Sequence, residues 1–292
     1  MLDKYTESCF ASTMNIAEAL REATEILQNA GVPEARREAG SLLSFVIGKN
    51  RTFLISHAED DVDDSRLAQF RNAVERRAAG EPLQYITGVQ DFFGREFRVT
   101  PDVLIPRPET ELLVEAALEV NKTATLICDI GTGSGCIALT LLCELNDARA
   151  VAVDKSPSAL EIAKFNAQKL SVRERVEFVV SDCFDSVEPR EFDLIVSNPP
   201  YVSADVLAGL QREVRDHEPL VALSPGPDGL SIIRRLVQEA PQFLKPNGHL
   251  IMEIGFDQSE AVPQLIDANV WELRQIRPDL QGIPRIVVLR KQ

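Results

Sequence analysis

Long apolar runs are missing from this sequence of 292 residues. No uninterrupted stretch reaches the length of about 18 apolar residues that a membrane-spanning helix requires. The first ten residues, Met1–Phe10, also lack the basic segment followed by an apolar stretch that marks a signal peptide. These absences predict a cytoplasmic protein with no membrane partner.

Cysteine and positive charge are scarce as well. The five cysteines are odd in number and scattered, without a CxxC pair or a histidine spacing typical of zinc, so we expect neither disulfides nor a metal site. Acidic residues outnumber basic ones by 45 to 31, which gives a net charge of −14. Because nucleic-acid binding relies on many Lys and Arg side chains, direct contact with nucleic acid is a poor first hypothesis.

A helical pattern fills the segment 15–80. Apolar residues recur there at helical spacing, Gly31 and Gly48 are placed to end the first two helices, and Ser65 is placed to cap a third. The pattern changes after Gly88, where aromatic and β-branched residues flank Gly94 and predict a β-hairpin. We therefore assign residues 1–87 to a small helical bundle and residues 88–107 to a hairpin linker.

Short apolar runs alternate with amphipathic helices in residues 108–292. This alternation is typical of an α/β fold with a doubly wound parallel sheet. The last two runs are joined by a loop containing Pro and Gly rather than by a helix, so we expect an antiparallel edge and hence a mixed sheet. The expected strands lie at Thr125–Cys128, Ala150–Val153, Val176–Val180, Leu194–Val196, His249–Glu253, Trp271–Ile276 and Ile286–Leu289.

Three alternating glycines follow the first expected strand, within Asp129–Cys136. They allow a tight turn and close approach of the backbone to a ligand, and a helix N-terminus with free N–H donors follows. The segment has neither the GxGxxG spacing of dinucleotide folds nor the GK[ST] ending of a phosphate loop, so a ligand without a diphosphate fits best. A strand-to-helix turn that binds nothing is the alternative.

Acidic residues follow the next two strands. Asp154 is placed where an acidic side chain binds ribose hydroxyls in nucleotide folds, and Asp182 is placed to accept a hydrogen bond from an adenine amino group. Ordinary polar residues at strand ends are the alternative interpretation. Together the three strand ends would hold a methionine tail, a ribose and an adenine along one edge of the sheet.

The tetrapeptide Asn198-Pro199-Pro200-Tyr201 follows the fourth strand. Its prolines fix φ and donate no hydrogen bonds, which leaves a rigid backbone with free carbonyl acceptors. The Asn198 side-chain oxygen and the Pro199 carbonyl suit the two hydrogens of an NH2 group, and Tyr201 is placed to stack on the planar group that bears it. Orienting the nitrogen in this way favours its attack on an electrophilic methyl group. The tetrapeptide therefore predicts methylation of a planar amide or amino nitrogen, with a Pro-rich turn as the alternative.

Taken together, these motifs resemble those of the release factor glutamine methyltransferase (PrmC/HemK) family. The resemblance spans residues 15–290 and rests on five segments: Gly80–Pro82, Ile105–Glu111, Asp129–Gly135, Asn198–Tyr201 and Glu253–Gly255. It implies a class I methyltransferase fold that uses S-adenosylmethionine. The implied substrate is the glutamine of the Gly-Gly-Gln motif in class I peptide chain release factors, which the helical domain would help to grip.

The resemblance also implies roles for individual residues. The methionine portion of the cofactor would be bound by Gly131, Thr132, Gly133, Ser134 and Gly135. The ribose would be bound by Asp154, and the adenine by Asp182 and Cys183. The substrate glutamine would be bound by Asn198, Pro199, Pro200 and Tyr201. Asn198, Pro199 and Tyr201 would be catalytic, and Asn198 would also contact the cofactor. Cys183 stands where many relatives have an aromatic residue, so either Cys183 or Phe184 covers the adenine. Arg107 and Glu111 suit a ligand contact or a salt bridge.

Other functions fit parts of the pattern. An adenine amino-methyltransferase acting on nucleic acid shares the tetrapeptide, but the acidic charge and the lack of a basic recognition domain disfavour it. A noncatalytic module that binds release factors is a second alternative, and a dehydrogenase, disfavoured by the glycine spacing, is a third. We expect the protein to act as a monomer.

Overall fold

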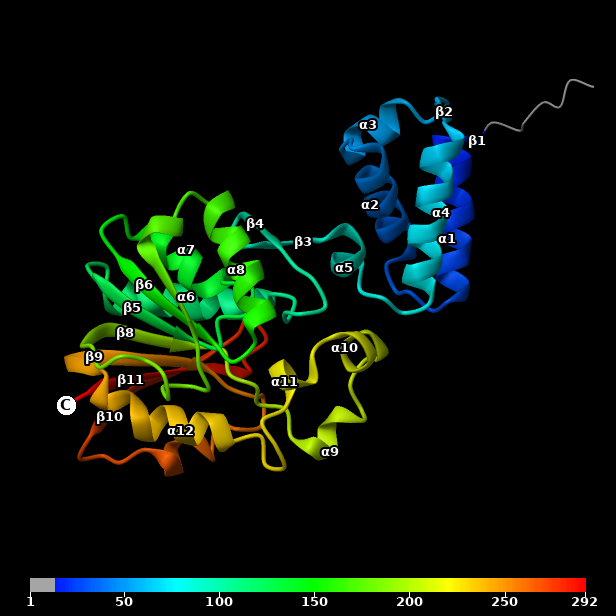
Figure 1. Ribbon diagram of the computed structural model, residues 1–292. Helices are drawn as coiled ribbons and strands as arrows, with labels where there is room; N and C mark the ends of the chain where they lie inside the picture. Colours follow the sequence, from blue (N-terminus) through cyan, green and yellow to red (C-terminus); the bar gives the residue numbers. More distant parts are fainter. Residues whose placement is uncertain (1–13) are drawn as a thin grey trace, which may run out of the picture. The chain divides into compact units, whose positions relative to one another are not determined.

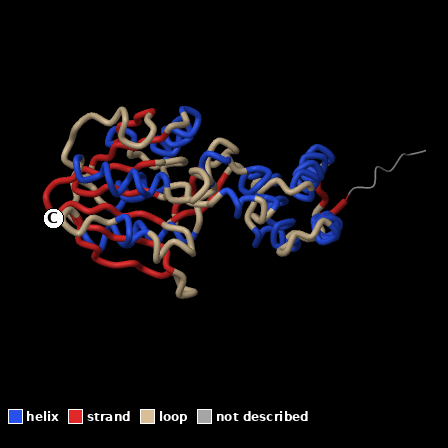
Figure 2. Tube along the Cα trace, turned by 90° about the horizontal axis from the view of Figure 1, so that it is seen from below, coloured by secondary structure: helices blue, strands red, loops and turns tan. Residues whose placement is uncertain are grey.

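The computed structural model describes residues 14–292, so the expectation drawn from Met1–Phe10 lies outside the described residues. The chain divides into two compact units, Met1–Thr87 and Gly88–Gln292. Figure 2 shows helices predominating in the first unit and strands gathered in the second. In the described part of the chain, no helix has the length and apolar character needed to cross a membrane.

The first unit is a helical bundle, as the sequence predicts. Its elements are β1 (Met14–Asn15), α1 (Ile16–Asn29), α2 (Ala35–Ile47), α3 (Arg51–Ser56), β2 (Asp61–Val62), α4 (Asp64–Ala78) and α5 (Leu83–Thr87). Leu27, Leu42 and Phe70, from α1, α2 and α4, are fully buried in one apolar core. The expected cap of α4 is wrong, because Asp63 and not Ser65 accepts the Arg66 N–H, at 2.9 Å.

A β-hairpin opens the second unit. Strands β3 (Val89–Phe92) and β4 (Arg95–Arg98) pair around Phe93 and Gly94, whose φ angles of 51° and 69° suit a two-residue turn. Phe92 and Phe97 meet edge to face, with ring centroids 6.1 Å apart, and belong to the core of the second unit. The hairpin thus packs on the sheet domain.

One mixed sheet of seven strands organises the second unit. Its order is β10-β11-β9-β8-β5-β6-β7, in which the neighbours from β9 to β7 are parallel and β11 is antiparallel to both β9 and β10. The predicted mixed sheet with its antiparallel edge is confirmed. The strands are β5 (Leu126–Ile130), β6 (Arg149–Asp154), β7 (Val176–Val180), β8 (Phe192–Ser197), β9 (Leu244–Glu253), β10 (Trp271–Pro278) and β11 (Pro284–Lys291).

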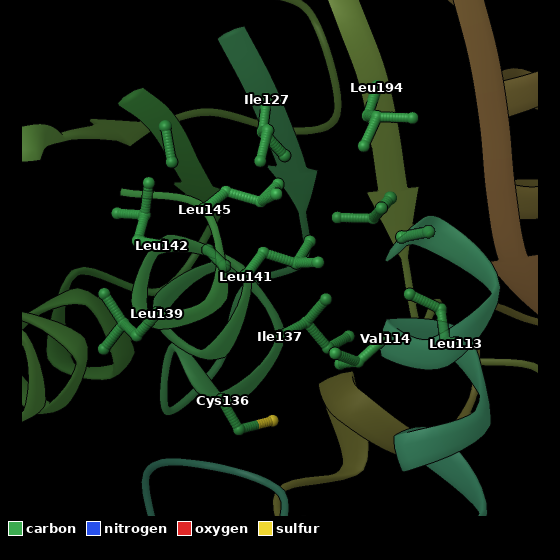
Figure 3. Packing of buried hydrophobic residues seen from close by; sticks show 14 of the residues in the cluster. Leu113, Val114, Ile127, Cys136, Ile137, Leu139, Leu141, Leu142, Leu145 and Leu194 are labelled. Carbon is green, nitrogen blue, oxygen red and sulfur yellow. The ribbon is translucent and has the colours of Figure 1, made fainter. Parts of the chain in front are cut away.

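Helices cover both faces of this sheet. One face carries α6 (Glu111–Val120), α7 (Cys136–Glu144) and α8 (Pro157–Lys169), and the other carries α12 (Ser231–Glu239) (Figure 1). Figure 3 shows Leu113 of α6 and Leu141 of α7 in the cluster with Ile127 and Leu194 of the strands. Cys128, which follows Ile127 in β5, packs on the opposite face of the sheet, because successive side chains of a strand point to opposite faces.

Shorter helices fill the connections. The link between β8 and α12 contains α9 (Ala204–Leu207), α10 (Arg212–His217) and α11 (Leu220–Leu223). Single turns of 3-10 helix are η1 (Pro108–Thr110), η2 (Arg173–Arg175), η3 (Ala240–Gln242) and η4 (Val262–Leu265). After β5 the chain moves to β6 on one side and later to β8 on the other, so a crevice opens at the carboxyl ends of these strands, where α/β sheets bind ligands.

Candidate active site

A cavity of about 340 Å³ lies at this crevice, within the second unit. Its volume falls in the range of roughly 300 to 1,000 Å³ that is usual for ligand pockets. The loops that follow four neighbouring strands, β5 to β8, contribute to its wall. The candidate residues on the wall are Gly131, Thr132, Gly133, Ser134, Asp154, Asp182, Cys183, Asn198, Pro199 and Pro200.

The glycine loop presents bare backbone to this cavity. Gly131 and Gly133 have φ angles of 75° and 55°, and a Cβ added to either would meet no other atom within 4 Å. The N–H groups of Gly131 and Thr132 both donate to the carbonyl of Val153 at 2.8 Å. The loop is therefore held against the end of β6 while its inner surface stays open to a ligand.

Gly135 has a different place from the other two glycines. It is absent from the cavity wall, and it precedes α7 with φ 83°. A Cβ at this position would lie 2.8 Å from a methyl carbon of Leu139 and 3.3 Å from the Cβ of Ala163. Gly135 therefore allows α7 and α8 to pack closely.

Asp154 is fixed at the end of β6. One carboxylate oxygen accepts the Gly133 N–H at 2.9 Å, and the other accepts the Ser156 N–H at 2.9 Å. Each oxygen keeps a lone pair that could accept from a hydroxyl group of a ligand. Burial raises the pKa of Asp154, and the backbone donors oppose that shift.

Two polar side chains near the loop have unused hydrogen-bonding capacity. One oxygen of the fully buried Asp129 accepts from the Thr132 hydroxyl at 2.7 Å and from the Ala138 N–H at 3.2 Å. Its other oxygen and the Ser134 hydroxyl have no partner among the described residues. Burial raises the pKa of Asp129 to about 7. Of the two residues only Ser134 lines the cavity, and its hydroxyl suits a polar ligand, because leaving a buried polar group unpaired costs free energy.

The wall beyond β7 is formed by Asp182 and Cys183. Asp182 accepts a hydrogen bond from Arg235 at 2.8 Å, so its carboxylate is already paired with a cation. Cys183 adopts φ 49° and lies on the wall, whereas Phe184 stacks on Phe243 with ring centroids 4.7 Å apart and is absent from it. Of the two candidates for covering an adenine, only Cys183 thus faces the cavity.

The tetrapeptide divides this cavity from a second one of about 410 Å³. The Ser197 hydroxyl donates to the Ile130 carbonyl at 2.7 Å and so fixes the end of β8 to the start of the glycine loop. Asn198 and Pro199 line both cavities, Pro200 lines only the first, and Tyr201 lines only the second. The second cavity is otherwise bordered by Leu104 and Arg107, by the connection between β8 and α12 and by residues that follow β9.

A buried network of hydrogen bonds lies behind the tetrapeptide. Glu253, at the end of β9, accepts from the Thr110 hydroxyl at 2.7 Å and from the Tyr201 hydroxyl at 3.0 Å. The Asn198 amide nitrogen donates to the Thr110 hydroxyl oxygen at 3.0 Å. Burial raises the pKa of both Glu253 and Tyr201. No described residue donates to the Asn198 side-chain oxygen or to the Pro199 carbonyl, so both acceptors are available at the junction of the cavities.

Sequence reasoning missed the roles of Thr110 and Glu253 in this network. Both residues lie in segments that carry the family resemblance, and this was the one available signal. Of the other residues singled out in those segments, Arg107 forms an ion pair with Glu218 and also lines both cavities. Glu111 accepts the Phe93 N–H at 2.7 Å and so ties the hairpin to α6.

Comparison with known proteins places the chain in a family. The PrmC N-terminal domain family matches residues 18–88, and the methyltransferase small domain family matches residues 108–212. A release factor glutamine methyltransferase from Koribacter versatilis is 44% identical over 281 residues, which cover 95% of this chain and 99% of the relative. One from Cereibacter sphaeroides is 46% identical over 277 residues, again 95% of this chain and 99% of the relative.

The fold has counterparts among solved structures. A methyltransferase from Pyrococcus furiosus aligns with a TM-score of 0.51 and 17% identity, over 78% of this chain and 98% of that protein. At this identity the likeness concerns the fold alone. It agrees with the class I methyltransferase sheet expected from the sequence.

Proposed function

Because the chain belongs to the release factor glutamine methyltransferase family, we propose that it methylates the side-chain amide nitrogen of the glutamine in the Gly-Gly-Gln motif of class I peptide chain release factors. The observation that carries this proposal is the position of Asn198 and Pro199, which line two adjoining cavities. A methyl donor in the first cavity and a glutamine in the second would meet at these residues.

The first cavity suits S-adenosylmethionine. The open backbone at Gly131 and Gly133 and the unpaired Ser134 hydroxyl fit the polar methionine portion. The Asp154 carboxylate fits the ribose, and Asp182 and Cys183 border the space left for the adenine. Once bound, S-adenosylmethionine supplies an electrophilic methyl group on sulfur.

The tetrapeptide prepares the nitrogen that receives this methyl group. An amide nitrogen is a poor nucleophile because its lone pair is shared with the carbonyl. The Asn198 oxygen and the Pro199 carbonyl would accept its two hydrogens, orient the nitrogen toward the first cavity and stabilise the positive charge that develops on it. The methylated nitrogen is strongly acidic and loses one proton to water, so a strong protein base is unnecessary. Tyr201, on the wall of the second cavity, would contact the planar amide.

The helical unit would grip the release factor while the second unit performs the chemistry. We further propose that the protein acts as a monomer in the cytoplasm, without direct contact with nucleic acid. The net charge of −14 supports the last point, because contact with a phosphate backbone would be repulsive.

Mass spectrometry of a class I release factor tests this function. The purified factor is incubated with the protein and S-adenosylmethionine, beside a matched factor in which the glutamine of its Gly-Gly-Gln motif is replaced by alanine. We expect one added methyl group on that glutamine and none on the altered factor. Absence of transfer to the factor, together with methylation of DNA or RNA in a parallel reaction, would instead identify an adenine amino-methyltransferase.

A further inference from the structure

The hydrogen bonds behind Asn198 define which way its side-chain amide faces. An Asn side chain carries an acceptor oxygen and a donor NH2 of almost the same shape, so the packing of neighbours alone does not distinguish its two orientations. The hydrogen-bonding groups around it must make the choice. These are the hydroxyl of Thr110 and, behind it, the carboxylate of Glu253, whose residues have exposed fractions of 2% and 1%, so water contributes little.

With Glu253 ionised, the count of protons leaves one solution. A carboxylate only accepts, and each oxygen of Glu253 faces one hydroxyl, that of Thr110 at 2.7 Å and that of Tyr201 at 3.0 Å. The Thr110 hydroxyl has a single hydrogen, which is given to Glu253, so its oxygen can only accept from Asn198. The group of Asn198 that lies 3.0 Å from Thr110 must therefore be the nitrogen.

This orientation determines which group Asn198 presents to the substrate. With its nitrogen bonded to Thr110, its oxygen is left for the junction of the two cavities, where it receives no hydrogen bond from a described residue. In the opposite orientation the Asn198 NH2 would face the NH2 of a substrate amide. Two donors would then oppose each other, and the nitrogen to be methylated would not be held.

We propose that Thr110 and Glu253 are positioning residues that lock the Asn198 amide with its oxygen toward the substrate. This inference rests on the proposed function and adds two residues that act on the reaction through Asn198, of which Thr110 also borders the first cavity. Thr110 ends η1, just before α6, and Glu253 ends β9, so the folding of the second unit brings the two residues together and fixes the orientation of the Asn198 amide.

Three substitutions separate this role from general support of the fold. Thr110→Val keeps the shape of the side chain and removes the hydroxyl, while Thr110→Ser keeps the hydroxyl. Glu253→Gln keeps the shape but can donate to Thr110, which frees the Thr110 hydrogen to bond the Asn198 oxygen and so favours the reversed amide. We expect kcat for the release factor to fall about 10- to 100-fold in Thr110→Val and Glu253→Gln and by less than about threefold in Thr110→Ser. The dissociation constant of S-adenosylmethionine, from calorimetry, should stay within about threefold in all three.

A double-mutant cycle shows whether Thr110 acts through Asn198. If it does, Thr110→Val should cause no further loss in an Asn198→Ala background. The proposal is wrong if the losses of kcat in the two single variants multiply in the double variant. It is also wrong if Thr110→Val keeps full activity, or if Thr110→Ser loses as much activity as Thr110→Val. Should Thr110→Val unfold, Glu253→Gln enters the same cycle.

A spectroscopic measurement tests the lock without using activity. The side-chain NH2 signals of Asn198 are identified by NMR as those missing in Asn198→Asp. We expect slow hydrogen exchange of these signals in the original protein and at least about tenfold faster exchange in Thr110→Val. Unchanged exchange would refute the lock. An original protein that fails to methylate the release factor but shows the expected exchange would refute only the proposed function.

Discussion

At the scale of single residues, Asn198 is the side chain on which the proposed chemistry depends most. Asn198→Ala removes the acceptor at the junction of the cavities, so we expect kcat for the release factor to fall about 10²- to 10³-fold, as when one group that stabilises a transition state is lost. Affinity for S-adenosylmethionine should change far less. Single-turnover kinetics and calorimetry measure the two quantities separately, and near-normal turnover would rule out the mechanism.

Residues near one another in the chain could be predicted, and contacts between distant ones could not. Asn198 and Pro199 stand in one tetrapeptide whose chemistry is readable from residue type alone. The contact between Thr110 and Glu253 joins residues 143 positions apart and depends on the order of strands in the folded sheet. For Gly135 the local pattern was misleading. Its spacing in the glycine loop suggested a ligand contact, whereas the side chains around it indicate that it allows two helices to pack closely.

Asp129 should give the stability of the protein a recognisable dependence on pH. Burial raises its pKa to about 7 in the folded state, against about 3.9 in an unfolded chain. Between these values the folded state holds a proton that the unfolded state has lost, so the free energy of unfolding decreases as the pH rises, by at most about 1.4 kcal/mol per pH unit. The stabilisation that comes from keeping Asp129 protonated is complete below the pKa of the unfolded chain, and it is lost as the pH rises through about 7.

The matched variant is Asp129→Asn, which resembles the protonated acid and does not titrate. We expect its unfolding free energy to vary less steeply than that of the original protein between about pH 4.5 and 6.5. Urea unfolding without cofactor, followed by the fluorescence of Trp271, measures this difference for the second unit, because Trp271 is the single tryptophan of the chain. Parallel pH profiles for the two proteins would contradict the assignment.

At the scale of elements, the strands could be predicted well and the short helices could not. Runs such as Ala150–Val153 are bounded by polar residues and are buried in the sheet, so their pattern is strong. Helices α9 and α11 have four residues each, too few to show a helical period. The start of α4 was misplaced because Asp63, Asp64 and Ser65 are all good caps, and the choice depends on where β2 ends.

One side chain connects three elements around the glycine loop. Asn166 of α8 is fully buried, donates to the carbonyls of Arg98 and Ser134 at 3.0 and 2.9 Å, and accepts the Arg98 N–H at 2.8 Å. It thus joins the β3–β4 hairpin to the glycine loop. Asn166→Ala would leave these backbone groups unpaired, at a cost of about 1 to 3 kcal/mol for each buried group.

We expect Asn166→Ala to lower the unfolding free energy of the second unit by about 2 to 5 kcal/mol and to weaken S-adenosylmethionine binding. The control is Gln168→Ala on the exposed side of the same helix, which should change stability by less than about 0.5 kcal/mol. Trp271 fluorescence in urea and calorimetry measure the two effects. Equal behaviour of the two variants would show that the hairpin and the loop are not coupled.

At the scale of the whole molecule, the two units have separate cores, so we expect methyl transfer and recognition of the release factor to depend on different units. The helical unit has its own buried cluster, and both cavities of the candidate site lie in the second unit. The proposed chemistry therefore needs only the second unit, whereas a folded release factor offers a surface far larger than one glutamine. Recognition of that larger surface is the role that we propose for the helical unit.

A chain that begins at Gly88 tests this division. We expect it to bind S-adenosylmethionine within about threefold of the full chain, because every residue of the first cavity is retained. Its KM for the release factor should rise at least about tenfold, since the contacts of the helical unit are lost. Its kcat/KM for a short peptide containing Gly-Gly-Gln should match that of the full chain, because such a peptide reaches only the second unit. Circular dichroism and Trp271 fluorescence confirm that the shortened chain is folded. Equal losses for the peptide and the factor would assign the helical unit to the stability of the catalytic site rather than to the grip on the factor.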